Sequence, residues 1–336
     1  MPSAEMNCYL VTKSDDAKPT AAPARRPLSD LPAGDVLVRV AWSSLNYKDA
    51  LAASGHPGVV RRFPHVPGID AAGNVEESSS NKFRPGDRVL ITGFEMGAPA
   101  WGGWAEYVRV PAGWLVPLPT ELSFRESMIF GTAGFTAAQS IEQLQHNEIT
   151  PDRGMVVVTG STGGVGSLAV AILARLGYRV AAVTGKTDSH EWLRSLGAEE
   201  ILGREVVNDT STRPLLSARW VGAVDTVGGN TLATVIRSTD RHGCVTACGL
   251  VGGTDLELSV HPFILRGVRL VGIDSATWDI DRRPPLWDKM AGPWRPGALE
   301  SLVDDTVELD GLDAVVKKIL AGRVRGRVLV RVGGDD

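Results

Sequence analysis

Cysteine is scarce in this chain: Cys8, Cys244 and Cys248 are the only three among 336 residues. So few cysteines exclude a disulfide framework, and the last two are not spaced as the CxxC pairs of metal sites are. They lie in an apolar, strand-like stretch, "GCVTACGLV", which favours buried thiols. We therefore expect a protein of the reducing cytoplasm.

Long apolar runs and an excess of one charge are also missing. The best apolar stretch is interrupted by Arg175, Gly177 and Arg179, so no segment reaches the length of a membrane span. The residues from Met1 to Glu5 carry no basic segment leading into an apolar run, and therefore predict no signal peptide. The formal net charge of −4 argues against a nucleic acid as the main partner.

What the chain does have is a pattern of short apolar runs that divides it into three stretches. Residues 1–127 hold β-like runs broken by glycine and proline, such as "DVLVRVAW", and predict a compact, mostly β domain. Residues 128–274 alternate β-branched runs with helical stretches, which is typical of a parallel sheet covered on both faces. Residues 275–336 end in a helical stretch, "LDAVVKKILAG", and a closing strand, "GRVLVRV". The predicted fold class is α/β.

A glycine-rich loop joins a strand to a helix in the second stretch. The segment "VVVTGSTGGVGSLAVAILARLG" runs from Val156 to Gly177. In such a loop the backbone can approach a pyrophosphate, and the N–H groups of the helix N-terminus can bind its charge. A tight turn without a ligand is the alternative, but the flanking strand and helix favour a dinucleotide. The expected contacts are Ser161, Thr162, Gly163, Gly164 and Val165.

The tip of the next strand indicates which dinucleotide binds. An acidic residue there would bond the ribose 2′-hydroxyl of NAD and repel a 2′-phosphate. This chain instead has Thr184, Gly185 and Lys186, which offer a hydroxyl, an uncrowded N–H and a cation. Most lysines are solvated surface residues, but the position of this one favours a phosphate contact. We expect the cofactor to be NADPH.

The chain resembles the medium-chain dehydrogenase/reductase superfamily, in its zinc-free quinone-oxidoreductase branch, and more narrowly the acryloyl-CoA reductases. The resemblance extends from about Trp42 to Val330, in segments such as "WSSLNYKDALA", "VPGIDAAGNV", "WGGWAEYVRV", "GTAGFTAA", "DTVGG", "CGLVGG" and "PFILRGVRLVGIDS". It implies a GroES-like, β-rich catalytic domain first, then an inserted Rossmann domain with a doubly wound parallel sheet, and finally a return of the chain to the first domain.

The resemblance also implies a site without metal. Zinc-dependent relatives carry a cysteine ligand near "SLNYKD" and a His-Glu pair after the glycine of "PG", where this chain has Asn46-Tyr47 and Ile69-Asp70. The four-cysteine lobe of those relatives is missing, and the histidines show no ligand spacing. These are His56, His65, His146, His190, His242 and His261. Without a Lewis acid, alcohol oxidation is poorly supported, whereas reduction of an activated C=C bond needs less help.

For the catalytic residues, the resemblance places "NYKD" at the substrate end of the nicotinamide. Hydride transfer to the β carbon of an unsaturated carbonyl leaves negative charge on the carbonyl oxygen, which hydrogen-bond donors would stabilise. Asn46 and Tyr47 are the candidate donors, and Asp49 could orient them. Alternatively, Tyr47 only packs against the nicotinamide, and Asp49 belongs to an ordinary helix start. The α carbon then takes a proton from a side chain or from water.

Further cofactor contacts follow from the same resemblance. Arg204 is expected near the adenosine end, Leu250 and Ile264 along the nicotinamide, Ser275 close to it, and Arg327 reaching the cofactor from the returning segment. Sheet-end core packing is the alternative for the two apolar residues, and surface charge for Arg327. Two adjacent-arginine pairs, Arg61-Arg62 and Arg282-Arg283, could contact coenzyme A phosphates, but solvated charge is the commoner meaning of such pairs.

Three functions remain open. The first is an NADPH-dependent reductase of 2-enoyl thioesters, with acryloyl-CoA as the favoured substrate. The second is a quinone or free-enone reductase with the same fold and cofactor site, and the third is a non-catalytic NADPH-binding protein. We expect a small-molecule partner such as an acyl-CoA, no nucleic acid and no membrane, and, because relatives are usually dimers or tetramers, a homodimer.

Overall fold

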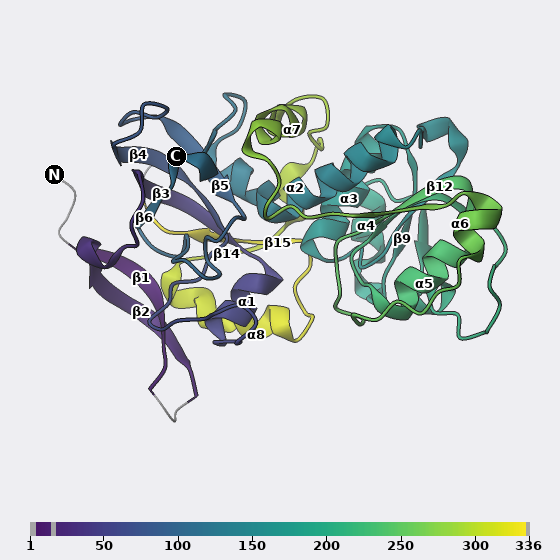
Figure 1. Ribbon diagram of the computed structural model, residues 1–336, viewed down its shortest axis with the longest axis horizontal. Coiled ribbons are helices and arrows are strands. Elements are labelled where there is room, and N and C mark those ends of the chain that lie inside the picture. Colours follow the sequence, from purple (N-terminus) through teal and green to yellow (C-terminus); the bar gives the residue numbers. More distant parts are fainter. Residues whose placement is uncertain (1–4, 15–17, 334–336) are drawn as a thin grey trace. The chain divides into compact units, whose positions relative to one another are not determined.

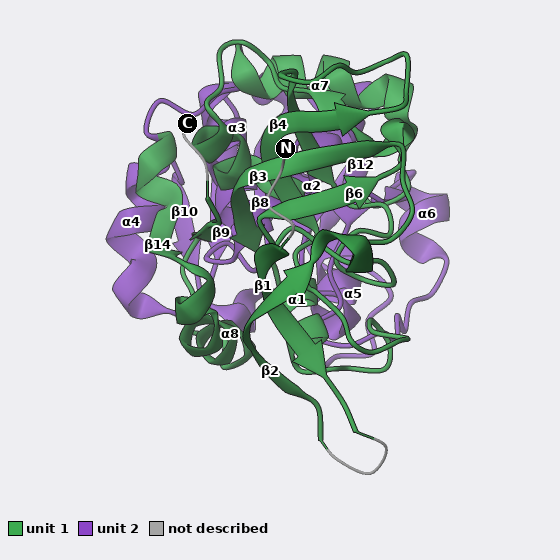
Figure 2. Cartoon of the chain, turned by 90° about the vertical axis from the view of Figure 1, so that its left-hand side faces the viewer, with its two compact units in different colours: residues 1–132, 276–292, 299–336 green, residues 133–275, 293–298 purple. Residues whose placement is uncertain are grey.

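The computed structural model describes residues 5–14 and 18–333, which fall into two compact units (Figures 1 and 2). Unit 1 comprises residues 1–132, 276–292 and 299–336, and unit 2 comprises residues 133–275 and 293–298. Where the sequence predicted boundaries at 127/128 and 274/275, the units change at 132/133 and 275/276. The return of 293–298 to unit 2 had no signal in the sequence. Residues 1–4, on which the expectation about a signal peptide mainly depends, lie outside the described residues.

Unit 1 is built on a mixed sheet in the order β14-β15-β3-β4-β5-β7, with β6 also paired to β3. Neighbouring strands are antiparallel except β14 and β15, which run parallel. A separate antiparallel pair is formed by β1 and β2. The strands are β1 (Glu5–Thr12), β2 (Thr20–Pro27), β3 (Val36–Leu45), β4 (Asp70–Ser78), β5 (Arg88–Thr92), β6 (Tyr107–Val110), β7 (Val116–Pro117), β14 (Val303–Val307) and β15 (Arg327–Arg331).

The central strand β3 shows why this sheet forms. Successive side chains of a strand point to opposite faces, and β3 is apolar on both. Val36, Val38 and Val40 pack into one buried core cluster, while Leu37 and Leu45 pack into another. The second cluster also receives one face of α1 (Tyr47–Ala53) and of α8 (Leu312–Leu320). Because β3 is packed on both faces, its end at Leu45 is held in place, and so is the start of α1 directly after it.

Unit 2 is a parallel sheet in the order β10-β9-β8-β11-β12-β13. Its strands are β8 (Met155–Val158), β9 (Arg179–Val183), β10 (Glu200–Leu202), β11 (Trp220–Asp225), β12 (Thr239–Ala247) and β13 (Arg269–Gly272). Numbered from β8, this is the 3-2-1-4-5-6 order of a doubly wound dinucleotide-binding sheet. The predicted α/β fold class is confirmed.

Helices connect these strands and leave the carboxyl ends of all of them at one edge of the sheet. They are α3 (Gly164–Arg175), α4 (His190–Ser195), α5 (Gly229–Arg237) and α6 (His261–Arg266). The longest of them, α3, buries every residue from 166 to 173. The chain also contains α2 (Phe124–His146), which passes from unit 1 into unit 2, and α7 (Arg283–Ala291).

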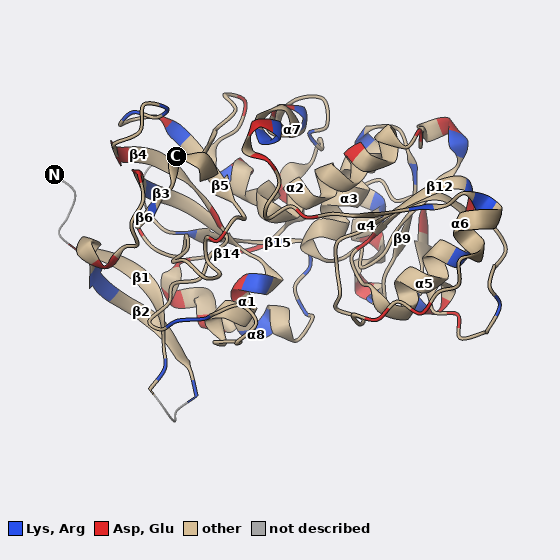
Figure 3. Ribbon diagram, viewed as in Figure 1, with Lys and Arg blue, Asp and Glu red and all other residues tan. Residues whose placement is uncertain are grey.

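Charged residues of both signs are distributed over the described chain. Acidic and basic residues are interspersed along both units (Figure 3), in keeping with the small net charge. Over the described ranges, no helix combines the length and the apolar character that crossing a membrane requires.

Candidate active site

The glycine loop of unit 2 lies at the carboxyl end of β8, next to the switch point between β8 and β11. Gly160 has a φ of 59°, and a Cβ there would collide with the Thr226 hydroxyl. A Cβ at Gly166 would likewise collide with the Gly160 carbonyl. These glycines therefore allow the backbone of the loop to pack closely against the start of α3. The first N–H groups of that helix have no partner within the helix.

The predicted loop residues have two different roles. Ser161 is buried, with its N–H bonded to the Val183 carbonyl at 3.1 Å and its hydroxyl to the Val158 carbonyl at 2.7 Å. It ties the loop to the neighbouring strand β9. Thr162 is also buried, while the three residues after it open to solvent at the start of α3. The accessible polar groups here are backbone N–H groups, which fit a pyrophosphate.

The tip of β9 carries a lysine directly after a glycine that an arginine covers. Thr184 accepts the Lys186 N–H at 3.0 Å, which turns the chain directly after the strand. Arg204 follows β10, and its guanidinium covers Gly185 so closely that a Cβ there would lie 2.8 Å from Nε. The donors of this corner are a hydroxyl-bearing turn, a lysine and an arginine, a set that suits a phosphate monoester. The residues present therefore fit NADPH.

The remaining predicted cofactor residues of unit 2 lie after β12, on α6 and after β13. Leu250 follows β12 and is 64% exposed, and Ile264 lies on α6 and is 73% exposed. Ser275 follows β13, and its hydroxyl accepts a hydrogen bond from the Thr136 hydroxyl at 2.7 Å. The two apolar residues are thus not core residues in this unit, which leaves them available to a ligand. Their contact with nicotinamide stays a prediction.

Asp225 is a buried carboxylate at this edge that was not among the predicted site residues. It accepts the Thr159 hydroxyl and the Gly228 N–H, each at 2.7 Å, and its own carbonyl accepts the Cys248 N–H at 2.9 Å. Burial raises the pKa of Asp225, and these hydrogen bonds oppose the rise. The residue joins the ends of β8, β11 and β12. An acid at the end of an otherwise apolar strand was the available signal.

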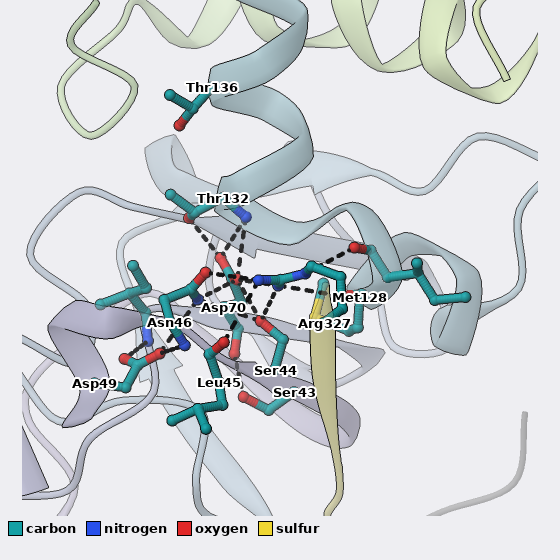
Figure 4. A network of polar contacts seen from close by, with 12 residues as sticks. Ser43, Ser44, Leu45, Asn46, Asp49, Asp70, Met128, Thr132, Thr136 and Arg327 are labelled. Carbon is teal, nitrogen blue, oxygen red and sulfur yellow. Dashed lines mark hydrogen bonds and ion pairs between the residues drawn. The ribbon is translucent and has the colours of Figure 1, made fainter. Parts of the chain in front are cut away.

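In unit 1, the predicted catalytic residues lie at the start of α1, and Figure 4 shows two of them, Asn46 and Asp49. Asn46 precedes the helix and Tyr47 opens it, with 45% of its surface exposed. Asp49 is fully buried and accepts the Asn46 N–H and the Ile69 N–H, both at 2.8 Å. Among the described residues, the Tyr47 hydroxyl has no hydrogen-bond partner. This side chain is therefore an accessible hydroxyl donor of the segment.

Arg327 lies beside these residues, because β15 pairs with β3 and places Val328 opposite Leu45. The guanidinium is only 2% exposed. Its Nε donates to the Ile129 carbonyl at 2.9 Å, and its terminal nitrogens donate to Asn46 Oδ1 at 3.1 Å and Ser44 Oγ at 2.8 Å. The expected contact with the cofactor stays a prediction, but the alternative of a surface charge is wrong, because the residue is buried.

Asp70 completes this group and was missed as a site residue. It is fully buried at the start of β4 and accepts the Ser44 hydroxyl at 2.6 Å and the Asn46 amide at 2.7 Å. It also accepts the Thr132 N–H and hydroxyl, and pairs with Arg327 at 3.8 Å. In the sequence, this position only indicated that a zinc ligand is missing. Nothing in the sequence indicated Ser44 or Thr132.

Gly131 is the glycine on which this network depends. It breaks α2 with a φ of 51°, and a Cβ there would overlap Asp70 Oδ2 and lie 2.9 Å from Arg327 Nη2. We expect Gly131→Ala to destabilise unit 1 by about 2 kcal/mol or more, through backbone strain and displacement of the buried pair. Differential scanning calorimetry should show a midpoint lower by roughly 5 °C. Gly113→Ala, where a Cβ meets nothing within 4 Å, is the control and should unfold like the wild type.

Asp49 makes stability depend on pH. Burial raises its pKa from 3.8 to about 7, and the neighbouring Asp70 carboxylate adds to the rise. The folded protein then holds a proton that the unfolded chain releases, so this contribution is full below about pH 4 and lost as the pH rises to 7. We expect the thermal midpoint to fall from pH 5 to pH 8, and to fall less in Asp49→Asn. The exposed Asp310→Asn is the control; an equal fall in all three proteins would contradict this assignment.

The thiols and possible metal ligands do not form a site of their own. Burial raises the pKa of Cys8 and of Cys244 to about 11, and that of Cys248 to about 12, so all three are weakly nucleophilic thiols. Within residues 5–14 and 18–333, no group of three His, Cys, Asp or Glu side chains could hold a metal ion. Arg283, from one of the arginine pairs, is buried against the Thr92 carbonyl and is not available to coenzyme A.

Comparison with known protein families shows to which superfamily the chain belongs. Residues 32–120 match the alcohol dehydrogenase GroES-like domain, and residues 164–291 match the zinc-binding dehydrogenase family. Acrylyl-CoA reductase AcuI of Ruegeria pomeroyi is 46% identical over 97% of this chain and 99% of its own length. The chain belongs to the medium-chain dehydrogenase/reductase superfamily. Putative quinone oxidoreductase YhfP of Bacillus subtilis is 45% identical over 90% of this chain and 92% of its own length.

Solved structures agree with this placement. The yhdH oxidoreductase of Salmonella enterica, in complex with NADP, is 45% identical with a TM-score of 0.94, and covers 97% of this chain and 100% of its own. The yhfP protein of Bacillus subtilis, with NAD bound, is 42% identical with a TM-score of 0.95, and covers 98% of this chain and 100% of its own. The predicted family is confirmed, including the GroES-like and Rossmann folds. Because both cofactors occur among such neighbours, the choice between them depends on this chain's own residues.

Proposed function

We propose that this protein catalyses NADPH-dependent reduction of the C=C bond of a 2-enoyl thioester, with acryloyl-CoA converted to propanoyl-CoA. The observation that carries the proposal is the 46% identity, over nearly the whole of both chains, to a relative named acrylyl-CoA reductase. A second relative, from Escherichia coli and named probable acrylyl-CoA reductase, is 44% identical over 96% of this chain.

The choice of NADPH rests on the corner beside β9. Arg204 covers Gly185, and Lys186 follows directly after a turn that Thr184 stabilises, so these two cations would bind the 2′-phosphate of the cofactor. The backbone N–H groups at the start of α3 would hold the pyrophosphate. Leu250 and Ile264 would then line the nicotinamide, with Ser275 near it.

In this mechanism, NADPH supplies the hydride that adds to the β carbon of the substrate when it is bound. The charge that develops on the thioester oxygen is stabilised by the Tyr47 hydroxyl, an exposed hydrogen-bond donor of unit 1. Asn46 and Asp49 do not contact the substrate in this mechanism. They hold the start of α1, and with it Tyr47, because their polar groups are bonded to one another and to buried neighbours. A proton then adds to the α carbon, from Tyr47 or from water, and completes the saturated product.

Reduction of a quinone or a free enone is the second candidate. It is favoured by the 45% identity to the relative named putative quinone oxidoreductase. The same hydride and the same Tyr47 donor would serve a conjugated ketone or a quinone. The two candidates differ only in what recognises the rest of the substrate.

The deciding experiment measures NADPH consumption by the purified protein with acryloyl-CoA, crotonyl-CoA and a benzoquinone in parallel. We expect the highest kcat/KM with acryloyl-CoA, and propanoyl-CoA as its product by mass spectrometry. A higher kcat/KM with the quinone would replace the first candidate by the second. No consumption with any of them would favour a non-catalytic NADPH-binding protein.

We also propose that the protein is a cytoplasmic homodimer. Strand β13 ends the order of the sheet in unit 2, and in the described chain no strand covers its outer side. Exposed apolar side chains lie in this strand and in the segment before it: Leu256, Val260, Leu265 and Leu270. An uncovered strand with such neighbours can pair with the same surface of a second copy. Light scattering should give twice the mass of 35.7 kDa, and the free thiols fit a reducing compartment.

A further inference from the structure

The amide of Asn46 has no donor to spare for a substrate. Its Nδ2 donates to Asp70 Oδ2 at 2.7 Å and to Asp49 Oδ2 at 3.2 Å, and its Oδ1 accepts from Arg327 at 3.1 Å. An amide nitrogen carries two hydrogens, so both are engaged with buried carboxylates. A hydrogen bond from Asn46 to a substrate oxygen would break one of these and leave a buried acceptor unsatisfied.

The start of α1 is fixed by the same contacts. Asp49 accepts the backbone N–H of Asn46, and the Asn46 carbonyl accepts the N–H of Asp49 at 3.1 Å. The helix spans Tyr47–Ala53, which is too short to hold its own first turn by propensity alone. The direction in which Tyr47 leaves the backbone therefore depends on how Asn46 is held.

Two charged residues from distant parts of the chain hold Asn46. Asp70 opens β4, and Arg327 opens β15; both are almost completely buried. Each makes one hydrogen bond to the Asn46 amide, and their charges lie 3.8 Å apart. Asp70 thus bonds the nitrogen of the amide and Arg327 bonds its oxygen. Because the two charges are opposite and close, each lowers the free-energy cost of burying the other.

We propose that Asp70 and Arg327 are positioning residues for the reduction: they orient Asn46, which in turn fixes the first turn of α1 and the Tyr47 hydroxyl. This inference rests on the proposed function. Arg327 is specially suited to the task, because its planar guanidinium reaches Ser44, Asn46 and the α2 carbonyls at once. A lysine would keep the charge but not this fork.

The first test replaces Arg327 by lysine. We expect kcat with acryloyl-CoA to fall about 10- to 100-fold, since a misplaced donor loses much of its effect, while the Kd for NADPH stays within about threefold. The matched control is Arg283→Lys, because Arg283 is equally buried in unit 1 and bonds to the Thr92, Ala276 and Trp278 carbonyls. The control should keep its kcat even if its thermal midpoint falls. A rise of tenfold or more in the Kd for NADPH with Arg327→Lys would overturn the proposal and support a direct cofactor contact.

The second test combines Arg327→Lys with Tyr47→Phe. If Arg327 acts through the Tyr47 hydroxyl, its replacement should cost less than about threefold once that hydroxyl is gone, because coupled residues are not additive. Equal fold losses of kcat in the wild-type and Tyr47→Phe backgrounds would show a general structural effect and overturn the proposal.

The third test needs no substrate. Hydrogen exchange of the peptide that covers Tyr47–Ala53 should be faster in Arg327→Lys than in the wild type, and unchanged in Arg283→Lys. Unchanged exchange in both variants would overturn the proposal. Failure of the proposed function would appear separately, as a wild type that does not reduce 2-enoyl thioesters although Arg327→Lys still accelerates exchange in α1.

Discussion

Replacing Lys186 and Arg204 together by alanine should weaken NADPH binding about 10²- to 10⁴-fold while the Kd for NADH changes less than about threefold. Each cation can make a charge-assisted hydrogen bond to the 2′-phosphate, worth about 1.5–3 kcal/mol, and tenfold in affinity corresponds to about 1.4 kcal/mol. NADH has a hydroxyl in place of this phosphate and gains little from either charge. Titration followed by nicotinamide fluorescence measures both constants.

The single variants Lys186→Ala and Arg204→Ala show how much each cation contributes to NADPH affinity. Arg204 lies over Gly185, so it is held by packing, whereas Lys186 carries its charge on a flexible four-carbon stem. We expect each alone to cost about 10- to 100-fold. Arg194→Ala, an exposed arginine of α4 in the same unit, is the control and should bind as the wild type does. A wild type that binds NADH as tightly as NADPH would contradict the assignment of this corner.

The fold of unit 2 could be predicted because its signals are local. Each parallel strand is a short β-branched run, and Gly160, Gly163 and Gly166 mark the turn between β8 and α3 by their spacing in the chain. The side of the sheet on which ligands bind then follows from topology alone. Arg204 was harder to place, because its contact with Gly185 joins two strand ends that are neighbours only in the folded sheet.

The centre of unit 1 could be predicted only in part. Asn46, Tyr47 and Asp49 are close in sequence and belong to a recognisable segment. The groups that hold them are not: Asp70, Thr132 and Arg327 come from other elements, and the separation of Arg327 from Asn46 is 281 residues. A buried Arg–Asp pair looks in the sequence like two unrelated charges, since burial and pairing exist only after folding. The contacts of Asn46 favour a different role from the predicted one, and we propose that it supports Tyr47 instead of donating to the substrate.

Removing the Tyr47 hydroxyl should have the largest effect on the chemistry. Tyr47→Phe keeps the ring and removes the donor that the structure leaves free, so kcat with acryloyl-CoA should fall about 10²- to 10³-fold, as for other lost oxyanion donors. The Kd for NADPH should stay within about threefold, because the loops of unit 2 are unchanged. Stopped-flow measurement of NADPH oxidation in a single turnover isolates the hydride step from product release.

Adding Asn46→Ala to this variant separates two roles for the amide. If Asn46 donates directly to the substrate, the double variant should lose a second factor of about 10²; if it only supports Tyr47, the further loss should be less than about threefold. We expect the smaller loss, because the Asn46 amide is already bonded to Asp49, Asp70 and Arg327. Tyr107→Phe makes the same chemical change at a buried position of unit 1 and should leave kcat unchanged. Near-normal turnover in Tyr47→Phe, with thermal unfolding like that of the wild type, would move the donor to another part of the chain.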